Sequence, residues 1–334
     1  MVNSSQVRKL FDKFTSSRVL IIGDVMIDSY MFGKVERISP EAPIPIVTST
    51  HKENRLGGAA NVALNIKSLG ATPLLCSVIG KDEKSDVLME RLNVQGISPE
   101  GLVQTTKRKT TVKTRIISQH QHLLRVDEED DTLLSASLEK RLLELIYKTL
   151  SQSIDAVIFE DYDKGVITPA IIEHTTELAN EYNIPVVVDP KKRNYHQYKN
   201  ITLFKPNFRE LVEGSKTDVV KSDHKKLFTL AKKLHKTRNI DLLLITLSEA
   251  GVFISDGESY STIPAEVREI TDVSGAGDTL IATASLCCAA GLTPFDIASI
   301  SNLAGGLVCE KSGVVPVNRD DLMEEMLIRL ENDE

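Results

Sequence analysis

Residues 18–24 read Arg-Val-Leu-Ile-Ile-Gly-Asp, an apolar run of strand length in which hydrophobic and polar side chains do not alternate. A strand with one wet face alternates, whereas a strand of a parallel sheet is covered on both faces and is apolar throughout. The run therefore predicts a central parallel strand that ends at Gly23 and Asp24.

Five further apolar runs of this kind follow, and helical patterns separate them. The strand-like runs are residues 73–79, 155–160, 185–189, 201–205 and 241–247. The helical patterns are residues 59–69, 133–150, 168–182, 223–236, 277–290 and 294–310. Strand and helix in strict succession predict an α/β fold with one doubly wound, mainly parallel sheet flanked by helices.

Two segments depart from this succession, at about residues 30–50 and 110–127. The first holds the turn-rich stretch Ile-Ser-Pro-Glu-Ala-Pro-Ile-Pro, and the second alternates through Val112, Thr114 and Ile116. We interpret them as antiparallel strands outside the main sheet that form a small discontinuous β lid on a single domain spanning 1–334. Ordinary surface hairpins would give the same pattern.

Composition excludes several classes of protein. The chain of 334 residues is 41% hydrophobic and 26% charged, which is typical of a globular protein, and it has no uncharged apolar stretch of membrane-spanning length. Its net charge of -7 disfavours nucleic acid as a partner, because binding to a phosphate backbone needs a basic surface. We expect neither a membrane nor a nucleic-acid partner.

The N-terminal segment predicts a short amphipathic helix rather than a signal peptide, because Val7, Leu10, Phe11 and Phe14 fall at helical spacing. Four cysteines occur without a Cys-x-x-Cys pair or the dense spacing of a disulfide scaffold. Buried reduced thiols and a cytoplasmic location are the expectation.

The sharpest local motif is Asp-Val-Ser-Gly-Ala-Gly-Asp-Thr at residues 272–279, directly before an apolar helical stretch. Glycines at a helix N-terminus let backbone amides converge on an anion. A carboxylate there can take a proton from a hydroxyl that attacks a phosphoryl group, and this is the role we assign to Asp278. An Asp that merely caps the helix after a glycine turn would account for the motif equally well.

Other candidate ligands stand where predicted strands or helices meet. Gly57, Gly58 and Asn61 open a helix, and Asp24 and Asp28 follow the first strand, at the edge where open α/β sheets bind ligands. Carboxylates suit sugar hydroxyls. A close helix–sheet contact and a capped turn are the structural alternatives.

Later strand ends carry more candidates. Asn207 and Glu210 follow the 201–205 run, where Asn207 can cap a helix and Glu210 can hold Mg²⁺ through water. Asp161 and Lys164, and then Asp189 and Lys191, follow two other runs. The basic residues at 191–193 would suit either a solvated loop or a phosphate.

Searches for other nucleotide and hydrolase motifs fail. The sequence has no Gly-x-x-x-x-Gly-Lys-Ser/Thr loop, no His-Glu-x-x-His, no Gly-x-Ser-x-Gly, and no Gly-x-Gly-x-x-Gly after the first strand. P-loop NTPases, zincins, α/β-hydrolases and common dinucleotide-binding oxidoreductases are therefore disfavoured.

Taken together and in order, these motifs resemble the ribokinase-like, or phosphofructokinase-B, family of carbohydrate kinases over nearly the whole chain. The detail is most similar to the heptose 7-phosphate kinase module of bacterial ADP-heptose synthesis. Three segments carry that likeness: residues 23–28 (Gly-Asp-Val-Met-Ile-Asp), 37–45 (Arg-Ile-Ser-Pro-Glu-Ala-Pro-Ile-Pro) and 57–63 (Gly-Gly-Ala-Ala-Asn-Val-Ala).

The resemblance implies specific roles. Asp278 would be the catalytic base, with Gly275, Ala276 and Gly277 as an anion hole. The ATP and Mg²⁺ site would include Asn207, Phe208, Arg209, Glu210, Thr246, Gly251 and Asn302, with Glu210 serving the metal. The sugar site would include Asp24, Asp28, Gly57, Gly58, Asn61, Asp161, Lys164, Asp189 and Lys191. A monovalent cation such as K⁺ near Asp272 would also fit.

The sequence departs from the family pattern at Phe208 and Arg209, where smaller or more polar residues are expected, and at Glu160, where a small residue is usual. Related bifunctional enzymes continue into a nucleotidyltransferase domain, which this sequence does not contain. The resemblance implies ATP-dependent phosphorylation of D-glycero-β-D-manno-heptose 7-phosphate at the anomeric hydroxyl, by a homodimer joined through the lid. A kinase for another sugar or a nucleoside is the nearest alternative, and a non-catalytic sugar- or nucleotide-binding regulator is another.

Overall fold

A computed structural model describes residues 4–119, 121–266 and 270–332. Its main sheet has nine strands in the order β13-β12-β11-β10-β9-β8-β1-β4-β5. The parallel strands are β1 (Arg18–Gly23), β4 (Thr72–Gly80), β5 (Leu102–Thr105), β8 (Ala156–Glu160), β9 (Val186–Asp189), β10 (Ile201–Phe204) and β11 (Ile240–Thr246). Two antiparallel strands, β12 (Val252–Ser255) and β13 (Tyr260–Ile263), extend one edge. The predicted doubly wound α/β fold is confirmed.

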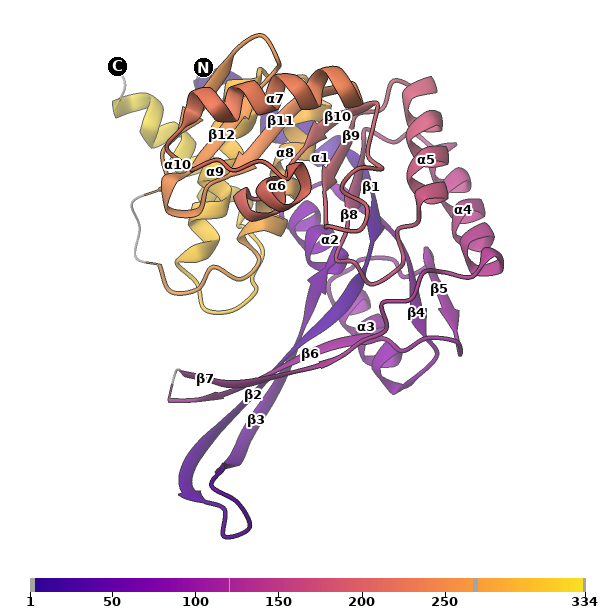
Figure 1. The fold of residues 1–334 in the computed structure, drawn as a ribbon, viewed down its shortest axis with the longest axis vertical. Helices are drawn as coiled ribbons and strands as arrows, with labels where there is room; N and C mark the ends of the chain where they lie inside the picture. Colours follow the sequence, from indigo (N-terminus) through magenta and orange to yellow (C-terminus); the bar gives the residue numbers. More distant parts are fainter. Residues whose placement is uncertain (1–3, 120, 267–269, 333–334) are drawn as a thin grey trace.

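Helices cover both faces of the main sheet (Figure 1). Those whose patterns were read in the sequence are α1 (Ser4–Ser16), α2 (Ala59–Ser68), α4 (Ala136–Leu150), α5 (Pro169–Glu181), α7 (His224–Arg238), α8 (Ala276–Ala290) and α9 (Pro294–Cys309). The others are α3 (Glu83–Val94), α6 (Phe208–Ser215) and α10 (Arg319–Asn332). The amphipathic helix predicted at the N-terminus is confirmed, because α1 buries the four apolar residues named above.

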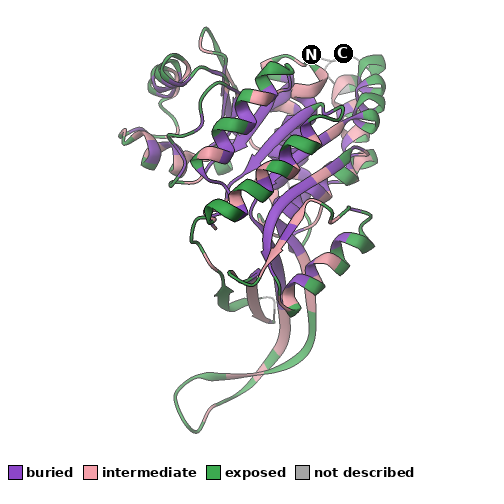
Figure 2. Ribbon diagram, turned by 90° about the vertical axis from the view of Figure 1, so that its right-hand side faces the viewer, coloured by how far each residue is buried: buried purple, intermediate pink, exposed green. Residues whose placement is uncertain are grey.

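The core lies in two layers, one on each face of the main sheet. Along β1, Val19 and Ile21 point into the cluster under α2, α8 and α9, whereas Leu20 and Ile22 point into the cluster under α4, α5 and α7. All four side chains are buried, which explains why this strand is apolar at every position. Figure 2 shows this buried centre.

A second sheet of four strands projects from the main body as a long arm (Figure 1). Its order is β3-β2-β6-β7, built from β2 (Val25–Ile38), β3 (Pro45–Gly58), β6 (Thr111–Ser118) and β7 (Gln121–Glu128). The two predicted segments thus lie side by side outside the main sheet. His120, within the second of them, lies outside the described residues.

The prediction that these strands are antiparallel is right within each hairpin and wrong between the hairpins. β2 pairs antiparallel with β3, and β6 with β7, but β2 and β6 run parallel from Met26/Thr111 to Gly33/Ser118. The cause is that β2 follows β1 and β6 follows β5, and the carboxyl ends of β1 and β5 lie at the same end of the main sheet. Two segments of one chain that leave the same end of a sheet in the same direction pair as parallel strands.

Among the described residues, no helix is long and apolar enough to cross a membrane. The four cysteines are free thiols, two of them buried and two partly buried, as predicted.

A close backbone approach fixes the junction between β1 and β8. Gly23 pairs with Glu160, and a Cβ placed on Gly23 would lie 2.1 Å from the Glu160 carbonyl oxygen. No side chain at residue 23 fits without moving backbone. The motif glycine at the end of the first strand is therefore required for the two strands to lie together.

Replacing Gly23 by Ala should lower the free energy of unfolding by about 2–3 kcal/mol, since the added methyl group must push one of two buried strands aside. Gly305→Ala is the matched control, because a Cβ there meets its nearest atom at 3.6 Å. In a helix interior, alanine is about 1 kcal/mol better than glycine, so the control should lose no stability. Equal denaturant midpoints for Gly23→Ala and the unmodified protein would contradict this account.

Candidate active site

The carboxyl ends of the parallel strands meet the base of the second sheet and the N-terminus of α8. Asp278 lies in the first turn of α8 and is buried. Its carboxylate accepts a hydrogen bond from the Asn61 amide at 2.7 Å and one from the Tyr162 hydroxyl at 2.8 Å. Three segments far apart in the sequence thus converge on one carboxylate.

The glycine turn that precedes Asp278 has the shape the motif predicts. Gly275 is the N-cap of α8 with φ 83°, a left-handed conformation that favours glycine. The amides of the first turn lack acceptors inside the helix, so they form an electropositive end. The Ala276 amide also donates to the Val273 carbonyl at 3.3 Å, which closes the turn.

Burial sets the protonation of Asp278. Removal from water raises the pKa of this carboxyl to about 6, while the hydrogen bonds from Asn61 and Tyr162 act in the opposite direction and Asp189 adds to the rise. A carboxylate with a pKa near neutrality can both accept and release a proton under ordinary conditions. Its environment therefore suits a general base.

The glycine pair before α2 serves close approach. A Cβ on Gly57 would lie 2.3 Å from an oxygen of Asp28, and Gly58, with φ 57°, would meet the Asp24 carbonyl at 2.4 Å. Asp28 also forms an ion pair with Arg115 of β6. The structure thus brings Asp28, Gly57, Gly58 and Asn61 together beside Asp278.

Two predicted sugar ligands are used by the fold instead. Asp24 accepts the backbone amides of Tyr162, Lys164 and Val166 at 2.9, 3.1 and 3.1 Å, so its carboxylate holds the loop after β8. Asp161 is buried and accepts from the Asn194 amide, the Tyr198 hydroxyl and the Asp163 backbone. Neither carboxylate is turned toward Asp278.

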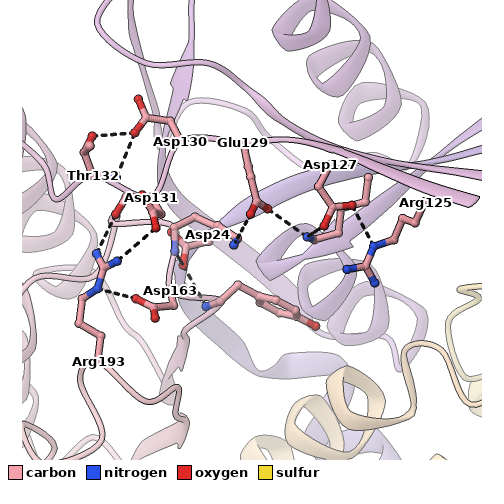
Figure 3. A network of polar contacts seen from close by, with 12 residues as sticks. Asp24, Arg125, Asp127, Glu129, Asp130, Asp131, Thr132, Asp163 and Arg193 are labelled. Atoms are coloured by element: carbon pink, nitrogen blue, oxygen red, sulfur yellow. Dashed lines mark hydrogen bonds and ion pairs between the residues drawn. The ribbon is translucent and has the colours of Figure 1, made fainter.

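Lys164 belongs to a charged network that joins the loop after β8 to the second sheet, and Figure 3 labels Asp127 and Glu129 of this network. Its ammonium bonds Glu129 at 2.9 Å, and Glu129 in turn pairs with Lys113 of β6 at 3.1 Å. Lys113 also pairs with Asp127 of β7 at 3.1 Å. These contacts fix the base of the arm over the site.

Lysines and carboxylates alternate on the other side of Asp278. Lys205, only 3% exposed, lies 2.7 Å from Asp189, and Lys191 pairs with Glu210 and lies over the Tyr162 ring. Burial opposes the charge on both lysines, yet the nearby carboxylates keep the pKa of each above its ordinary value. Both stay cationic, and Lys205 lies 3.8 Å from the Cβ position of Gly277.

Glu210 and Asn207 form a capping box at the start of α6, in which the Asn207 side chain accepts from the Glu210 amide at 2.9 Å and Glu210 accepts from the Asn207 amide at 2.8 Å. Thr246, at the end of β11, bridges to Asn207. These three predicted nucleotide residues therefore lie together.

The remaining predicted nucleotide residues are more scattered. Phe208 packs against the core, and Arg209 is exposed and pairs with Glu213. Gly251 makes a turn with φ 84°, and Asn302 donates to the Pro264 carbonyl at 2.9 Å. None of these four contacts Asp278 directly in the structure.

Glu160 lies under this group of charges. Both of its carboxylate oxygens are buried without a hydrogen-bond partner in the described residues. Burial first, and then Asp189 and Asp278, raise the pKa of Glu160 well above its ordinary value, which favours its neutral form.

The described residues contain no group of three or more His, Cys, Asp or Glu side chains arranged to hold a metal ion. Mg²⁺ that arrives with a nucleotide needs only one or two protein carboxylates, because water and phosphate oxygens supply its other ligands. Glu210 and Asp189 fit that need, since one oxygen of Asp189 is buried without a partner. Bound there, Mg²⁺ would neutralise phosphate charge.

Sequence reasoning missed Tyr162, Lys205, Arg115 and Glu129 as parts of the site. Tyr162 and Lys205 stand close to predicted ligands in the sequence. Nothing in their sequence neighbourhood shows that their side chains reach Asp278 and Asp189. Arg115 and Glu129 belong to the second sheet, and their positions depend on how the two hairpins pair. Because side chains alternate along β6, the sequence predicts that Arg115 shares a face with Lys113. It does not indicate whether that face lies toward the site.

The site combines a buried carboxylate with an electropositive helix end, a buried lysine and a partly buried lysine, which suits a phosphotransferase with an alcohol acceptor. A model of the pfkB family carbohydrate kinases matches residues 16–320, and the chain belongs to this family. It is an enzyme with an alcohol group as acceptor, and as a kinase of this family it uses ATP, usually with Mg²⁺.

Relatives and solved structures agree with this assignment. The bifunctional protein HldE of Citrifermentans bemidjiense is 38% identical over 96% of this chain and 66% of its own length. That of Granulibacter bethesdensis is 40% identical over 94% of this chain and 65% of its own. The chain thus spans about two thirds of the length of these relatives.

Among solved structures, phosphofructokinase-2 from Escherichia coli in complex with fructose-6-phosphate has a TM-score of 0.75 at 16% identity, over 95% of this chain and 99% of its own. Ribokinase from Arabidopsis thaliana, complexed with ribose and ATP, gives 0.72 at 15%, over 92% of this chain and 98% of its own. These likenesses show a ribokinase-like fold.

Substituting Asp278 by Asn should reduce kcat by about 100-fold or more while leaving the affinity for ATP nearly unchanged, because the amide keeps the shape and loses the base. For the unmodified enzyme, kcat should fall as the pH drops through about 6, where Asp278 takes up a proton. Steady-state ADP release from pH 5 to 9 measures both. Near-normal turnover of the Asn variant would remove Asp278 as the base.

Proposed function

We propose that this chain transfers the γ-phosphoryl group of ATP to the anomeric hydroxyl of D-glycero-β-D-manno-heptose 7-phosphate, giving the 1,7-bisphosphate for ADP-heptose and lipopolysaccharide core synthesis. The sequence likeness to the heptose 7-phosphate kinase module supports the sugar, as do relatives named HldE at 38–40% identity. Because the reaction consumes ATP, we place it in the cytoplasm.

The observation that carries a phosphorylated acceptor is a pair of arginines on the second sheet. Arg115 of β6 and Arg125 of β7 are directly opposite each other in the antiparallel register. Like charges in this position normally destabilise a sheet. Arg115 pairs with Asp28 and Arg125 pairs with Asp127 at 2.9 Å, and an anionic group of the substrate between the two guanidinium groups would compensate their remaining repulsion.

The same face gathers further charge. Side chains alternate along a strand, so Lys113, Arg115, Arg125 and Asp127 share one side of the hairpin β6–β7. Arg115 also pairs with Asp28, which ties that side to the glycine pair and to the catalytic carboxylate. The distal phosphate of the sugar would bind here, with the anomeric hydroxyl toward Asp278.

We also propose a role for Lys191 that differs from the sugar ligand implied by the resemblance. Lys191 pairs with Glu210 and lies beside Asp189 and over the Tyr162 ring. Because Glu210 belongs to the group proposed for nucleotide and Mg²⁺, Lys191 is better placed to meet the phosphates of ATP. The loop after β9 turns it to that side.

In the proposed reaction, the carboxylate of Asp278 accepts the proton of the anomeric hydroxyl as the oxygen attacks the γ-phosphorus, and the bond from the γ-phosphorus to the bridging oxygen breaks to release ADP. The first-turn amides of α8, together with Lys205 and Lys191, stabilise the charge on the phosphoryl oxygens. Asn61 and Tyr162 hold the carboxylate in position and keep part of its charge satisfied. A monovalent cation such as K⁺ near Asp272 would complete the electrostatics.

Removing the Arg125 guanidinium should distinguish phosphorylated from free sugars. Arg125→Gln should lower kcat/KM for heptose 7-phosphate by about 10-fold or more and leave that for unphosphorylated heptose nearly unchanged, because a charge-assisted bond to phosphate is lost. Arg37→Gln, at the far end of β2, is the control. Coupled measurement of ADP release gives both constants.

Equal kcat/KM for phosphorylated and free sugars in the unmodified enzyme would instead favour a kinase for another sugar. A screen of sugar phosphates under the same conditions would then identify the acceptor.

We further propose that two copies pair through their second sheets. The side opposite the charged one exposes Leu124 and Val126 on β7, next to Ile116 on β6, and the tip between β2 and β3 exposes Ile44. An apolar sheet face of this kind is stabilised when a second copy covers it. Val112, on the same strand as Ile116, is buried in the main core and adds nothing to this exposed face.

Ile116→Asp combined with Leu124→Asp should yield a folded monomer with a raised KM for the sugar, because closure of the arm over the site would lose its partner. Val94→Asp is the control, since Val94 is exposed on α3 outside the arm. Sedimentation at micromolar concentration gives the oligomeric state. An unmodified protein that is monomeric and fully active would contradict the pairing.

A further inference from the structure

We propose that Arg55 of β3 is a positioning residue that couples the second sheet to the glycine turn before Asp278. This role of Arg55 requires only the kinase activity that family membership gives, and it is the same whichever sugar is the acceptor. Arg55 contacts neither Asp278 nor the glycine turn itself. Its effect is transmitted through the segment 312–314, which follows α9.

The guanidinium of Arg55 bridges two carbonyls of that segment. It donates to Ser312 at 3.0 Å and to Val314 at 3.4 Å, while Glu53 accepts from it at 2.8 and 3.2 Å. The planar fork of arginine allows these contacts at the same time, which a single ammonium does not. Arg55 therefore fixes the segment against β3.

From this segment one connection runs through Gly313 to the motif. Gly313 has φ 72°, and a Cβ there would lie 2.3 Å from the Arg55 guanidinium, so the arginine occupies the space left by the missing side chain. The Gly313 amide donates to Asp272 at 3.0 Å, and the other oxygen of Asp272 accepts from the Ser274 amide at 2.9 Å. These bonds set the start of the glycine turn.

A second, shorter connection runs through Val314. The Val314 side chain lies 3.3 Å from the Cβ position of Gly275, the N-cap of the helix that carries Asp278. The backbone of Val314 is held from both sides, since its carbonyl accepts from Arg55 and its amide donates to the Tyr30 hydroxyl at 3.4 Å. A shift of Val314 would therefore move Gly275.

At its other end the chain of contacts reaches the proposed sugar site. Arg55 stacks over the Tyr30 ring at 5.0 Å, and Arg115 stacks over the same ring at 5.4 Å. Arg115 forms the ion pair with Asp28. Tyr30 is buried, so both guanidinium groups are held against one fixed ring.

On the side of β3, the 312–314 segment borders a pocket of about 350 Å³ between β3 and the helix residues Leu64 and Arg91. A pocket cannot hold the segment as close packing would. On this side the polar contacts of Arg55 take the place of packing, and they add to the bonds from Gly313 to Asp272 and from Val314 to Tyr30.

The test compares Arg55→Met and Arg55→Lys with Lys52→Met, a control on the same strand that borders the same pocket. In both Arg55 variants kcat should fall by about 10-fold or more, because a shift of about 1 Å near the reacting atoms is that costly, while the KM for the sugar changes little. Lys should fail to rescue, as it lacks the fork. Amide hydrogen exchange at residues 271–277 should speed up without any sugar present.

An Arg55→Met enzyme with kcat within twofold of the unmodified one, or with unchanged exchange at residues 271–277, would overturn the proposal. So would a general loss of stability with faster exchange throughout the core, since that marks a merely structural role. The exchange measurement needs no acceptor. If heptose 7-phosphate is not a substrate, the proposed function fails while this inference is still tested.

Discussion

The buried carboxylate of Asp278 is the constraint on which the rest of the site depends. It is removed from water, and within the described residues it accepts hydrogen bonds from Asn61 and Tyr162 at 2.7 and 2.8 Å. An ionised group in such a place is costly unless its partners are in position. The helix α2, the loop after β8 and the helix α8 must therefore be placed together before the carboxylate can serve as a base.

Several other contacts can be understood as maintaining that arrangement. Asp24 holds the loop that carries Tyr162, and Asn65 accepts from Thr279 at 2.9 Å and from the Val317 amide at 3.0 Å, which ties α2 to α8 and to the C-terminal segment. These buried hydrogen bonds thus orient the segments around Asp278. The few side chains left to bind substrate are those on the arm and beside β9 and β10.

Features encoded in a short stretch of sequence could be predicted. The strands buried on both faces, the helix that follows the 272–279 motif and the role of Gly275 depend on residues next to one another. The fates of Asp24 and Asp161 could not be predicted, because a carboxylate at a strand end can bind a ligand or a loop, and the choice depends on amides far away in the sequence. Lys191, expected among the sugar ligands, is proposed to meet the phosphates of ATP because it pairs with Glu210, and that contact depends on the tertiary path of the loop after β9.

The parallel pairing of β2 with β6 also bears on how the chain folds. The two hairpins of the arm are separated by more than fifty residues that include α2, β4, α3 and β5, and nothing local brings them together. Loop closure over such a separation costs conformational entropy that only contacts formed later can offset. β1, β4 and β5 of the main sheet must be paired before β2 and β6 can meet, so we expect the arm to become ordered after this part of the sheet on the folding pathway.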